Sequence, residues 1–184
     1  MTPRPAGKRR YIAPMPPIRI LGLDVSLRCT GYGLLDLDGP ALRAVDCGLI
    51  RTPAKAPLSE CLRRLAGGLR ELQESYAPDC VAIEGGFFFK NAKTATILGM
   101  ARGAAVAIFA ERQTPVYEYA PRRVKQAVCG YGDAGKAQVA LLVAQRLKIP
   151  LADVKDDASD ALAVAICHVQ TATSVQGLLL PAPL

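Results

Sequence analysis

The stretch Ile-Arg-Ile-Leu-Gly-Leu-Asp at residues 18–24 is a short apolar run that ends in the carboxylate of Asp24. A second apolar run, Cys-Val-Ala-Ile-Glu at residues 80–84, ends in Glu84. Runs of this length and composition are typical of buried strands. If a crossover helix makes the two strands parallel neighbours, about 4.8 Å apart, both carboxylates stand at one edge of the sheet. Open α/β sheets place their functional sites at that edge.

The neighbouring segments extend this sheet. Residues 30–37 and 41–50 are predicted strands that flank the turn Asp38-Gly39-Pro40, which favours an antiparallel meander with the first strand. Residues 116–119 form the fifth predicted strand. Helices are predicted at 58–76, 93–111, 121–129, 136–147 and 158–170, and Asn91 is suited to cap the second. The order predicts an α/β fold, in which helices flank a mixed five-stranded sheet made of a three-strand antiparallel meander and two parallel strands.

Length and composition indicate one compact domain with two extensions. The chain has 184 residues, within the usual range for a single domain. Residues 1–17 are rich in proline and arginine and hold no acid, which predicts a flexible basic arm. Residues 18–170 are expected to form the folded domain, and residues 171–184 a C-terminal tail.

Charge indicates a polyanionic partner. The 23 Lys and Arg against 16 Asp and Glu give a net charge of +7, which favours nucleic acid or a membrane surface. The two longest apolar runs, at 104–110 and 161–167, stop far short of the roughly 18 residues that span a bilayer. Proline and arginine stand where a secretory signal needs an apolar stretch. We therefore expect a cytoplasmic protein that binds nucleic acid and has no membrane partner.

The number and spacing of the histidine and cysteine residues limit which catalytic mechanisms and metal sites the chain can have. His168 is the one histidine of the chain, which excludes Ser-His-Asp and Cys-His mechanisms. The six cysteines are scattered, which favours reduced thiols that fill the core over disulfides or a zinc site. Any metal must then be held by carboxylates, which selects magnesium or manganese. His168 itself is expected at the end of the last helix or at the surface.

The last predicted helix opens with two further carboxylates. Asp157 and Asp160 are three residues apart, so they share one helical face. Either aspartate alone could be explained as a helix cap or a partner of the helix dipole, but that does not account for Asp24 and Glu84. Asp156 competes with Asp157 for its place. Four such carboxylates in a basic surround are typical of two-metal phosphodiester hydrolysis, with Lys136 or Lys125 neutralising charge on the phosphate.

Several motifs together make the chain resemble a known family. In order and context, the sequence between residues 18 and 168 resembles the RuvC Holliday-junction resolvases at Gly22-Leu23-Asp24, Thr30-Gly31-Tyr32-Gly33, Ala82-Ile83-Glu84, Lys90-Asn91, Ala101-Arg102-Gly103-Ala104, Val124-Lys125-Gln126, Lys136-Ala137-Gln138-Val139 and Asp157-Ala158-Ser159-Asp160-Ala161-Leu162. The resemblance implies a ribonuclease-H-like fold. It also implies a homodimeric endonuclease that resolves four-way DNA junctions by paired, symmetric cuts in recombination and DNA repair. It further implies Mg²⁺ or Mn²⁺, two ions per site, and work with the RuvAB branch-migration complex.

The resemblance also assigns roles to residues. It implies that the catalytic and metal-binding carboxylates are Asp24, Glu84, Asp157 and Asp160, assisted by the catalytic Lys136. DNA contacts are implied for Lys125, Arg28, Asn91 and Arg122, and Phe87 matches a phenylalanine that probes the junction. Phe88 and Phe89 fit a packing role as well as a DNA contact. The family usually has Pro-Gly after the first aspartate, whereas Val25-Ser26 stand there in this chain.

The predicted helix at 93–111 bears on assembly, because apolar residues lie on more than one of its sides. One side can cover the sheet while another meets a second subunit, whereas a monomer would have to bury the helix completely. Other functions compete with junction cleavage. They are a ribonuclease-H-like nuclease that acts on structured RNA, and a DNA-architectural protein without catalysis. An actin-like sugar kinase also has Gly-x-Asp after its first strand, but the chain is too short for its second lobe.

Overall fold

The computed structural model describes residues 16–85, 91–154, 157–174 and 180–184. Within these ranges, one five-stranded sheet has the order β3-β2-β1-β4-β5. Strands β1, β2 and β3 are antiparallel neighbours, whereas β1 with β4 and β4 with β5 are parallel. The strands are β1 (Ile18–Asp24), β2 (Cys29–Asp38), β3 (Ala41–Arg51), β4 (Cys80–Glu84) and β5 (Val116–Tyr119). The predicted mixed sheet is confirmed.

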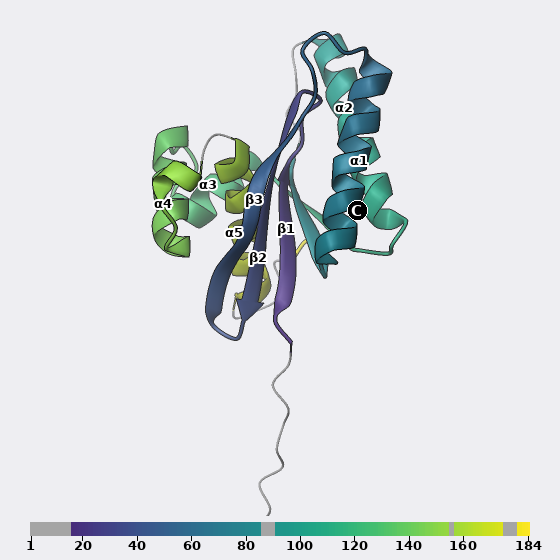
Figure 1. Ribbon diagram of the computed structural model, residues 1–184. Coiled ribbons are helices and arrows are strands. Elements are labelled where there is room, and N and C mark those ends of the chain that lie inside the picture. Colours follow the sequence, from purple (N-terminus) through teal and green to yellow (C-terminus); the bar gives the residue numbers. More distant parts are fainter. Residues whose placement is uncertain (1–15, 86–90, 155–156, 175–179) are drawn as a thin grey trace, which may run out of the picture.

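Helices cover both faces of this sheet, which makes three layers (Figure 1). Helices α1 and α2 lie on one face, and α3, α4 and α5 lie on the other. Their bounds are α1 (Leu58–Tyr76), α2 (Ala92–Ala110), α3 (Pro121–Cys129), α4 (Lys136–Leu147) and α5 (Asp157–Thr173). A short 3₁₀ helix, η1 (Leu151–Asp153), was not predicted. Helix α1 runs through Gly67-Gly68 without a break, because its buried leucine stripe holds it on the sheet.

Side chains of the central strands alternate between two cores. On β1, Ile20 joins the core under α3, α4 and α5, and Leu21 joins the core under α1 and α2. On β4, Ala82 and Ile83 divide in the same way. Because successive strand residues point to opposite faces, these short runs bury apolar surface in both directions. That explains why both runs are almost continuously apolar.

Helix α5 is the most deeply buried helix, and glycines on the sheet allow its close approach. A Cβ atom built on Gly22 would collide with the carbonyl oxygen of Ala161, and one on Gly31 would collide with that of Asp157. The backbone of α5 therefore lies directly on β1 and β2. Small residues such as Ala161 and Ala165 in α5, both fully buried, complete this contact.

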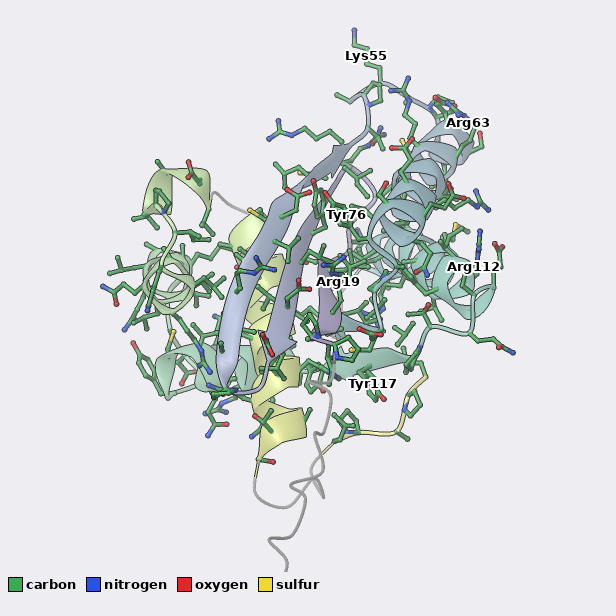
Figure 2. All side chains as sticks on the ribbon, turned by 60° about the horizontal axis from the view of Figure 1, so that its bottom comes forward. Arg19, Lys55, Arg63, Tyr76, Arg112 and Tyr117 are labelled. Atoms are coloured by element: carbon green, nitrogen blue, oxygen red, sulfur yellow. The ribbon has the colours of Figure 1, made fainter. Side chains whose placement is uncertain are left out.

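The expectation that His168 lies at the surface was wrong, because this residue in the C-terminal half of α5 is only 6% exposed. One ring nitrogen, Nδ1, lies 2.9 Å from the hydroxyl of Tyr119, and Nε2 lies 3.3 Å from the thiol of Cys80. The ring of Tyr117, labelled in Figure 2, packs 4.7 Å away, centroid to centroid. Burial lowers the pKa of His168 to about 4, so the neutral ring joins α5 to β4 and β5.

The cysteines divide into two groups. All six thiols are free, but only Cys61, Cys80 and Cys167 are buried. The prediction that cysteines fill the core is therefore confirmed for three of them, and Cys29, Cys47 and Cys129 are half-buried.

The C-terminal end of the folded domain differs from the expected boundary, whereas β1 begins at Ile18 as expected. Helix α5 continues to Thr173, into the segment predicted as a tail. The amide of Leu184 donates to the carbonyl of Val116 at the edge strand β5, over 2.8 Å. Residues 1–15 of the predicted arm lie outside the described residues.

Helix α2 is long and apolar enough to cross a membrane by length and composition, and it is the one such helix among the described residues. This property is a weak indication of a span, because core helices of globular proteins share it. Four of its side chains, Ala101, Ala105, Ile108 and Phe109, are buried against the rest of the fold.

We expect Gly22→Ala to lower the free energy of unfolding by about 3 kcal/mol, because the added methyl group must push α5 away from β1. Gly67→Ala is a matched control, since a Cβ there meets nothing within 4 Å. In a helix interior this change should stabilise the protein by up to about 1 kcal/mol. Urea denaturation measures both, and equal stability of the two variants would contradict the close packing of α5.

Candidate metal centre

Asp24 and Glu84 end two parallel neighbouring strands. The register pairs Leu23 of β1 with Ile83 of β4, so the next residue of each strand is one of the two acids. Helix α1 lies between these strands in the chain and supplies the crossover that makes them parallel. The predicted meeting of Asp24 and Glu84 at one sheet edge is therefore confirmed.

The turn after Asp24 is built by hydroxyl groups. The hydroxyl of Ser26 donates to the carbonyl of Cys29 over 2.6 Å and accepts from the Cys29 amide at 3.1 Å. The hydroxyl of Thr30 donates to the Ser26 carbonyl over 2.6 Å and accepts from the Ser26 amide at 3.2 Å. These reciprocal bonds close the turn from β1 into β2, where the family usually has Pro-Gly. Val25-Ser26 therefore supports a defined turn by other means.

The start of α5 brings two more carboxylates to the same place. Ligand oxygens of Asp24, Asp157 and Asp160 all lie within 4.8 Å of one another, and all three residues are half-buried. Asp157 reaches β2 because Gly31 has no side chain to keep the helix away. Carboxylate oxygens gathered this closely need only small side-chain movements to bind one cation, since Mg²⁺ takes oxygen ligands at about 2.0–2.1 Å. The competing candidate Asp156 lies outside the described residues.

Glu84 is more distant from this trio but faces the same space. It lines a cavity of about 330 Å³ together with Asp24, Asp160, Lys125 and Lys136. The cavity has apolar walls from Val124, Val139 and Ala163. The four predicted carboxylates are thus brought to one site, with three in a tight group and Glu84 at its side.

Burial and mutual repulsion disfavour the charged forms of these acids. Burial, followed by the charges of Asp160 and Asp157, raises the pKa of Asp24 from 3.8 to about 6. Burial and the charges of Asp24 and Asp160 raise the pKa of Glu84 from 4.5 to about 7. Lys136 opposes both shifts. Bound cations would relieve this concentration of negative charge, so the arrangement is suited to a metal site.

Two lysines line the basic side of the cavity. Lys136, the first residue of α4, places its ammonium 3.0 Å from Oδ2 of Asp160. That hydrogen bond raises the pKa of Lys136. The lysine is 78% exposed, so it can turn from the carboxylate towards an incoming phosphate. Lys125 on α3 lines the same cavity.

The predicted DNA-contacting residues have different surroundings. Arg28 uses Nη1 to hold the loop after β3, donating to the carbonyls of Pro53 at 2.7 Å and Ala56 at 3.1 Å. Asn91 caps α2 as predicted, since its side-chain oxygen accepts from the Lys93 amide at 2.9 Å. Arg122 on α3 is exposed and lies 3.8 Å from Asp133. Phe87, Phe88 and Phe89 lie outside the described residues.

Two residues near the predicted carboxylates, Cys29 and Arg102, were given no role from the sequence. Cys29, at the start of β2, lies next to the trio, and burial and the Asp157 carboxylate raise the pKa of its thiol to about 11. Behind Glu84, the guanidinium of Arg102 contacts the Glu84 carbonyl and the carboxylate of Glu118. Arg102 belongs to one of the family motifs, but no role was predicted for it. The spacing of these residues in the sequence gives no signal that they meet.

A larger cavity, of about 530 Å³, lies between α1 and β3 and is not the candidate centre. The hydroxyls of Tyr32 and Tyr76 both donate to one oxygen of Asp46 there, at 3.2 and 2.6 Å. Arg63 and Tyr76 of α1, both labelled in Figure 2, line this cavity, and Tyr76 is the last residue of that helix. Its acids are not gathered into a ligand group, whereas those of the smaller cavity are.

Known proteins are similar in sequence to this chain over nearly the whole folded domain. The sequence profile of the family described as crossover junction endodeoxyribonuclease RuvC matches residues 20–168. Proteins of that description from Chloroflexus aggregans and Desulforamulus reducens are 48% and 43% identical over 161 and 158 residues. Each alignment covers 86% of this chain and 97% of the relative.

Solved structures agree. RuvC of Thermus thermophilus, 30% identical, superposes with a TM-score of 0.79 and covers 91% of this chain and 100% of its own. The same protein in complex with a Holliday junction substrate gives a TM-score of 0.81, covering 91% of this chain and 99% of its own. The yeast mitochondrial Holliday junction resolvase Ydc2, at 13% identity and a TM-score of 0.64, shares the fold. The chain therefore belongs to the RuvC family of crossover junction endodeoxyribonucleases, and its mixed sheet with flanking helices is a ribonuclease-H-like fold.

Proposed function

We propose that this protein resolves four-way DNA junctions in recombination and DNA repair, by metal-dependent hydrolysis of phosphodiester bonds. The observation that carries this function is the convergence of Asp24, Asp157 and Asp160 within 4.8 Å, beside Glu84, at the carboxyl edge of the sheet. The RuvC of Thermus thermophilus forms a complex with a Holliday junction as its substrate. We carry that substrate over to this chain because the two folds superpose across almost all of it.

The donor set fits Mg²⁺ or Mn²⁺. Carboxylate oxygens are the ligands these hard cations prefer, and the raised pKa values of Asp24 and Glu84 indicate that the site holds its negative charge at a cost. Asp24 has Asp157 and Asp160 on one side and influences Glu84 on the other. We therefore propose two ions per site, which these four carboxylates would hold. The bound ions would activate the attacking water and stabilise the leaving oxygen.

The chain's own residues supply positioning and charge. Asp24, Glu84 and Asp160 line a cavity with apolar walls, and Asp157 lies beside two of them. These carboxylates would hold the cations that act on the phosphate, in a place where electrostatic interactions are stronger than in water. Lys136 moves from Asp160 to the phosphate and balances charge as it develops there. Lys125 contacts the DNA backbone at the same cavity.

Basic residues around the centre extend the DNA surface. The net charge of +7 favours phosphate contacts generally. We assign such contacts to Arg122, which is exposed on α3, and to the remaining donors of Arg28 and Asn91. Phe87 remains the proposed probe of the junction, and its position follows Glu84 by three residues.

A homodimer would give two equivalent centres for paired symmetric cuts. Helix α2 supports this assembly, because its buried stripe at Ala101, Ala105 and Ile108 leaves another side uncovered. On that side Met100 is 45% exposed, and a Cβ on Gly103 would meet nothing within 4 Å. A small and apolar surface of this kind allows a second helix to approach closely.

Family membership favours junction DNA over structured RNA, and the complete carboxylate set favours catalysis over a purely architectural role. We further propose that the protein acts in the cytoplasm with the RuvAB branch-migration complex, as the family resemblance implies. Purified protein, synthetic four-way junctions and linear duplexes, with strand mapping in several metals, test the whole assignment. Equal cutting of duplex and junction would overturn it.

Asp24→Asn should abolish metal-dependent cutting of a four-way junction while junction affinity stays within about threefold, because the change removes a metal ligand and leaves the basic surface intact. Cleavage on gels and binding in EDTA measure the two properties. Asp38→Asn, at the exposed end of β2, is the matched control and should cut normally. Metal-dependent turnover by Asp24→Asn would refute the assignment.

The same substitution should stabilise the metal-free protein at high pH. Since the pKa of Asp24 is raised from 3.8 to about 6, charging this carboxyl costs the folded state stability as the pH rises through that range. At pH 8 we expect Asp24→Asn to raise the free energy of unfolding by on the order of 2 kcal/mol. The difference should shrink as the pH falls towards 4, where the folded wild type keeps the proton. Urea denaturation in EDTA at both pH values checks this, and a difference independent of pH would contradict the raised pKa.

Met100→Glu should convert the dimer to a monomer, because it places a charge on the uncovered side of α2. Sedimentation velocity measures the assembly state. Leu141→Glu on α4 is the matched control, since Leu141 is 43% exposed and Met100 is 45% exposed. The α2 interface is wrong if Met100→Glu sediments as the wild type does.

A further inference from the structure

Arg102 stands behind the metal centre, on the face of the sheet that the centre does not use. It belongs to α2, whose buried stripe packs with α1 and the strands, whereas the carboxylate cavity is lined from α3, α4 and α5. Its side chain is only 18% exposed. Arg102 Nη1 donates to the backbone carbonyl of Glu84, and Nη2 lies 2.8 Å from Oε2 of Glu118.

Glu118 is part of the same arrangement. It precedes Tyr119 on β5, and the register pairs Ile83 with Glu118 and Glu84 with Tyr119. A Cβ atom built on Gly85 would lie 2.8 Å from Oε1 of Glu118, so that carboxylate packs against the backbone that follows Glu84. The Gly85 amide donates to the Tyr119 carbonyl over 2.7 Å.

These contacts hold the backbone where the sheet stops supporting it. Pairing between β1 and β4 reaches only Leu23 and Ile83, and β4 itself ends at Glu84. Past that point, the chain is held on the β5 side by Gly85 and from α2 by Arg102. The direction of the Glu84 side chain depends on the orientation of this terminal peptide.

We propose that Arg102 is a positioning residue that fixes the peptide of Glu84 and so aims the Glu84 carboxylate at the metal cavity, with Glu118 holding the guanidinium in place. This inference rests on the proposed function, in which Glu84 is a metal ligand. A guanidinium is suited to the task because its planar fork bonds a carbonyl and a carboxylate at once, which the single ammonium of lysine does less well. Partners that orient a ligand in this way typically change metal affinity or activity by about 10–100-fold when removed.

The pair also links the metal centre to α2. Arg102 and the proposed dimer residue Met100 lie two positions apart on this helix, so they point to different sides. Helix α2 therefore presents the proposed dimer surface on one side and, on another side, the arginine that contacts the Glu84 backbone.

The experiment compares full-length variants of Arg102 with a matched arginine just beyond the end of α2. Arg102→Met keeps an unbranched side chain about as long as the aliphatic stem of arginine and removes the guanidinium donors, and Arg102→Lys keeps the charge. Arg112→Met is the control, because Arg112, labelled in Figure 2, lies 3.8 Å from Glu74 with both side chains 63% exposed. Mn²⁺ binding is measured by electron paramagnetic resonance, alongside cleavage as a function of Mn²⁺ concentration, junction affinity in EDTA, and the melting temperature.

We expect Arg102→Met to raise both the Mn²⁺ dissociation constant and the Mn²⁺ concentration for half-maximal cleavage by about 10–100-fold. Arg102→Lys should lie between this variant and the wild type. Junction affinity in EDTA should change less than about twofold, since Arg102 does not contact DNA in this arrangement, and Arg112→Met should match the wild type. Unchanged Mn²⁺ affinity in Arg102→Met overturns the inference, as does a parallel loss of melting temperature and metal-free junction binding without rescue by lysine.

Two more variants keep the result decisive. If Arg102→Met does not fold, Glu118→Gln and Arg102→Lys decide, and wild-type Mn²⁺ affinity in both overturns the inference. Glu84→Gln separates the positioning role from the proposed function. If Glu84→Gln binds Mn²⁺ as the wild type does, the proposed function has failed, whereas if only Glu84→Gln loses Mn²⁺ the positioning role has failed. Because Arg102 acts through Glu84, the double variant Arg102→Met with Glu84→Gln should bind Mn²⁺ no more weakly than Glu84→Gln alone.

Discussion

Direct contact between the backbone of α5 and the glycines of the sheet is the constraint on which the rest of the structure depends. Gly22 and Gly31 leave no room for a side chain between β1, β2 and the helix. Asp157, at the start of that helix, can therefore reach Asp24 at the end of β1. A helix that rested on larger side chains would stand farther away, and the carboxylate trio would open. The contact between α5 and the sheet thus sets both the packing of the core and the geometry of the candidate metal centre.

The convergence of acids makes the metal-free site electrostatically unfavourable. Burial and repulsion raise the pKa values of Asp24 and Glu84 to about 6 and about 7, and Lys136 offsets only part of that effect. Cation binding would relieve the repulsion and lower the tendency of these carboxylates to bind protons. The acids of this cavity therefore stand in contrast to the net charge of the whole chain, which is +7. In the proposed function, the excess of basic residues would attract the phosphate backbone, and the acids of the cavity would hold the ions that act on it.

The two faces of the sheet contribute differently to this centre. The face under α3, α4 and α5 supplies Asp157, Asp160 and both lysines of the cavity. The opposite face supplies support from behind, through Arg102 on α2 and its bond to the Glu84 carbonyl. His168 adds a buried polar connection from α5 to Cys80 and Tyr119 on the adjacent strands. The carboxylates are therefore held by elements that are themselves joined across the sheet.

The sequence alone determined the strand and helix order, the placing of Asp24 and Glu84 at neighbouring strand ends, and the shared face of Asp157 and Asp160. Those features follow from local periodicity and from the geometry of parallel strands, which act over a few residues. Tertiary structure alone decided the burial of His168, the hydroxyl-bonded turn at Ser26 and Thr30, the use of Arg28 to hold a loop, and the pairing of Arg102 with Glu118. Each of these except the turn joins residues at least 16 positions apart, and the turn depends on which hydroxyls face each other once β2 is paired. Contacts between distant residues are set by packing of the whole chain, so no local pattern encodes them.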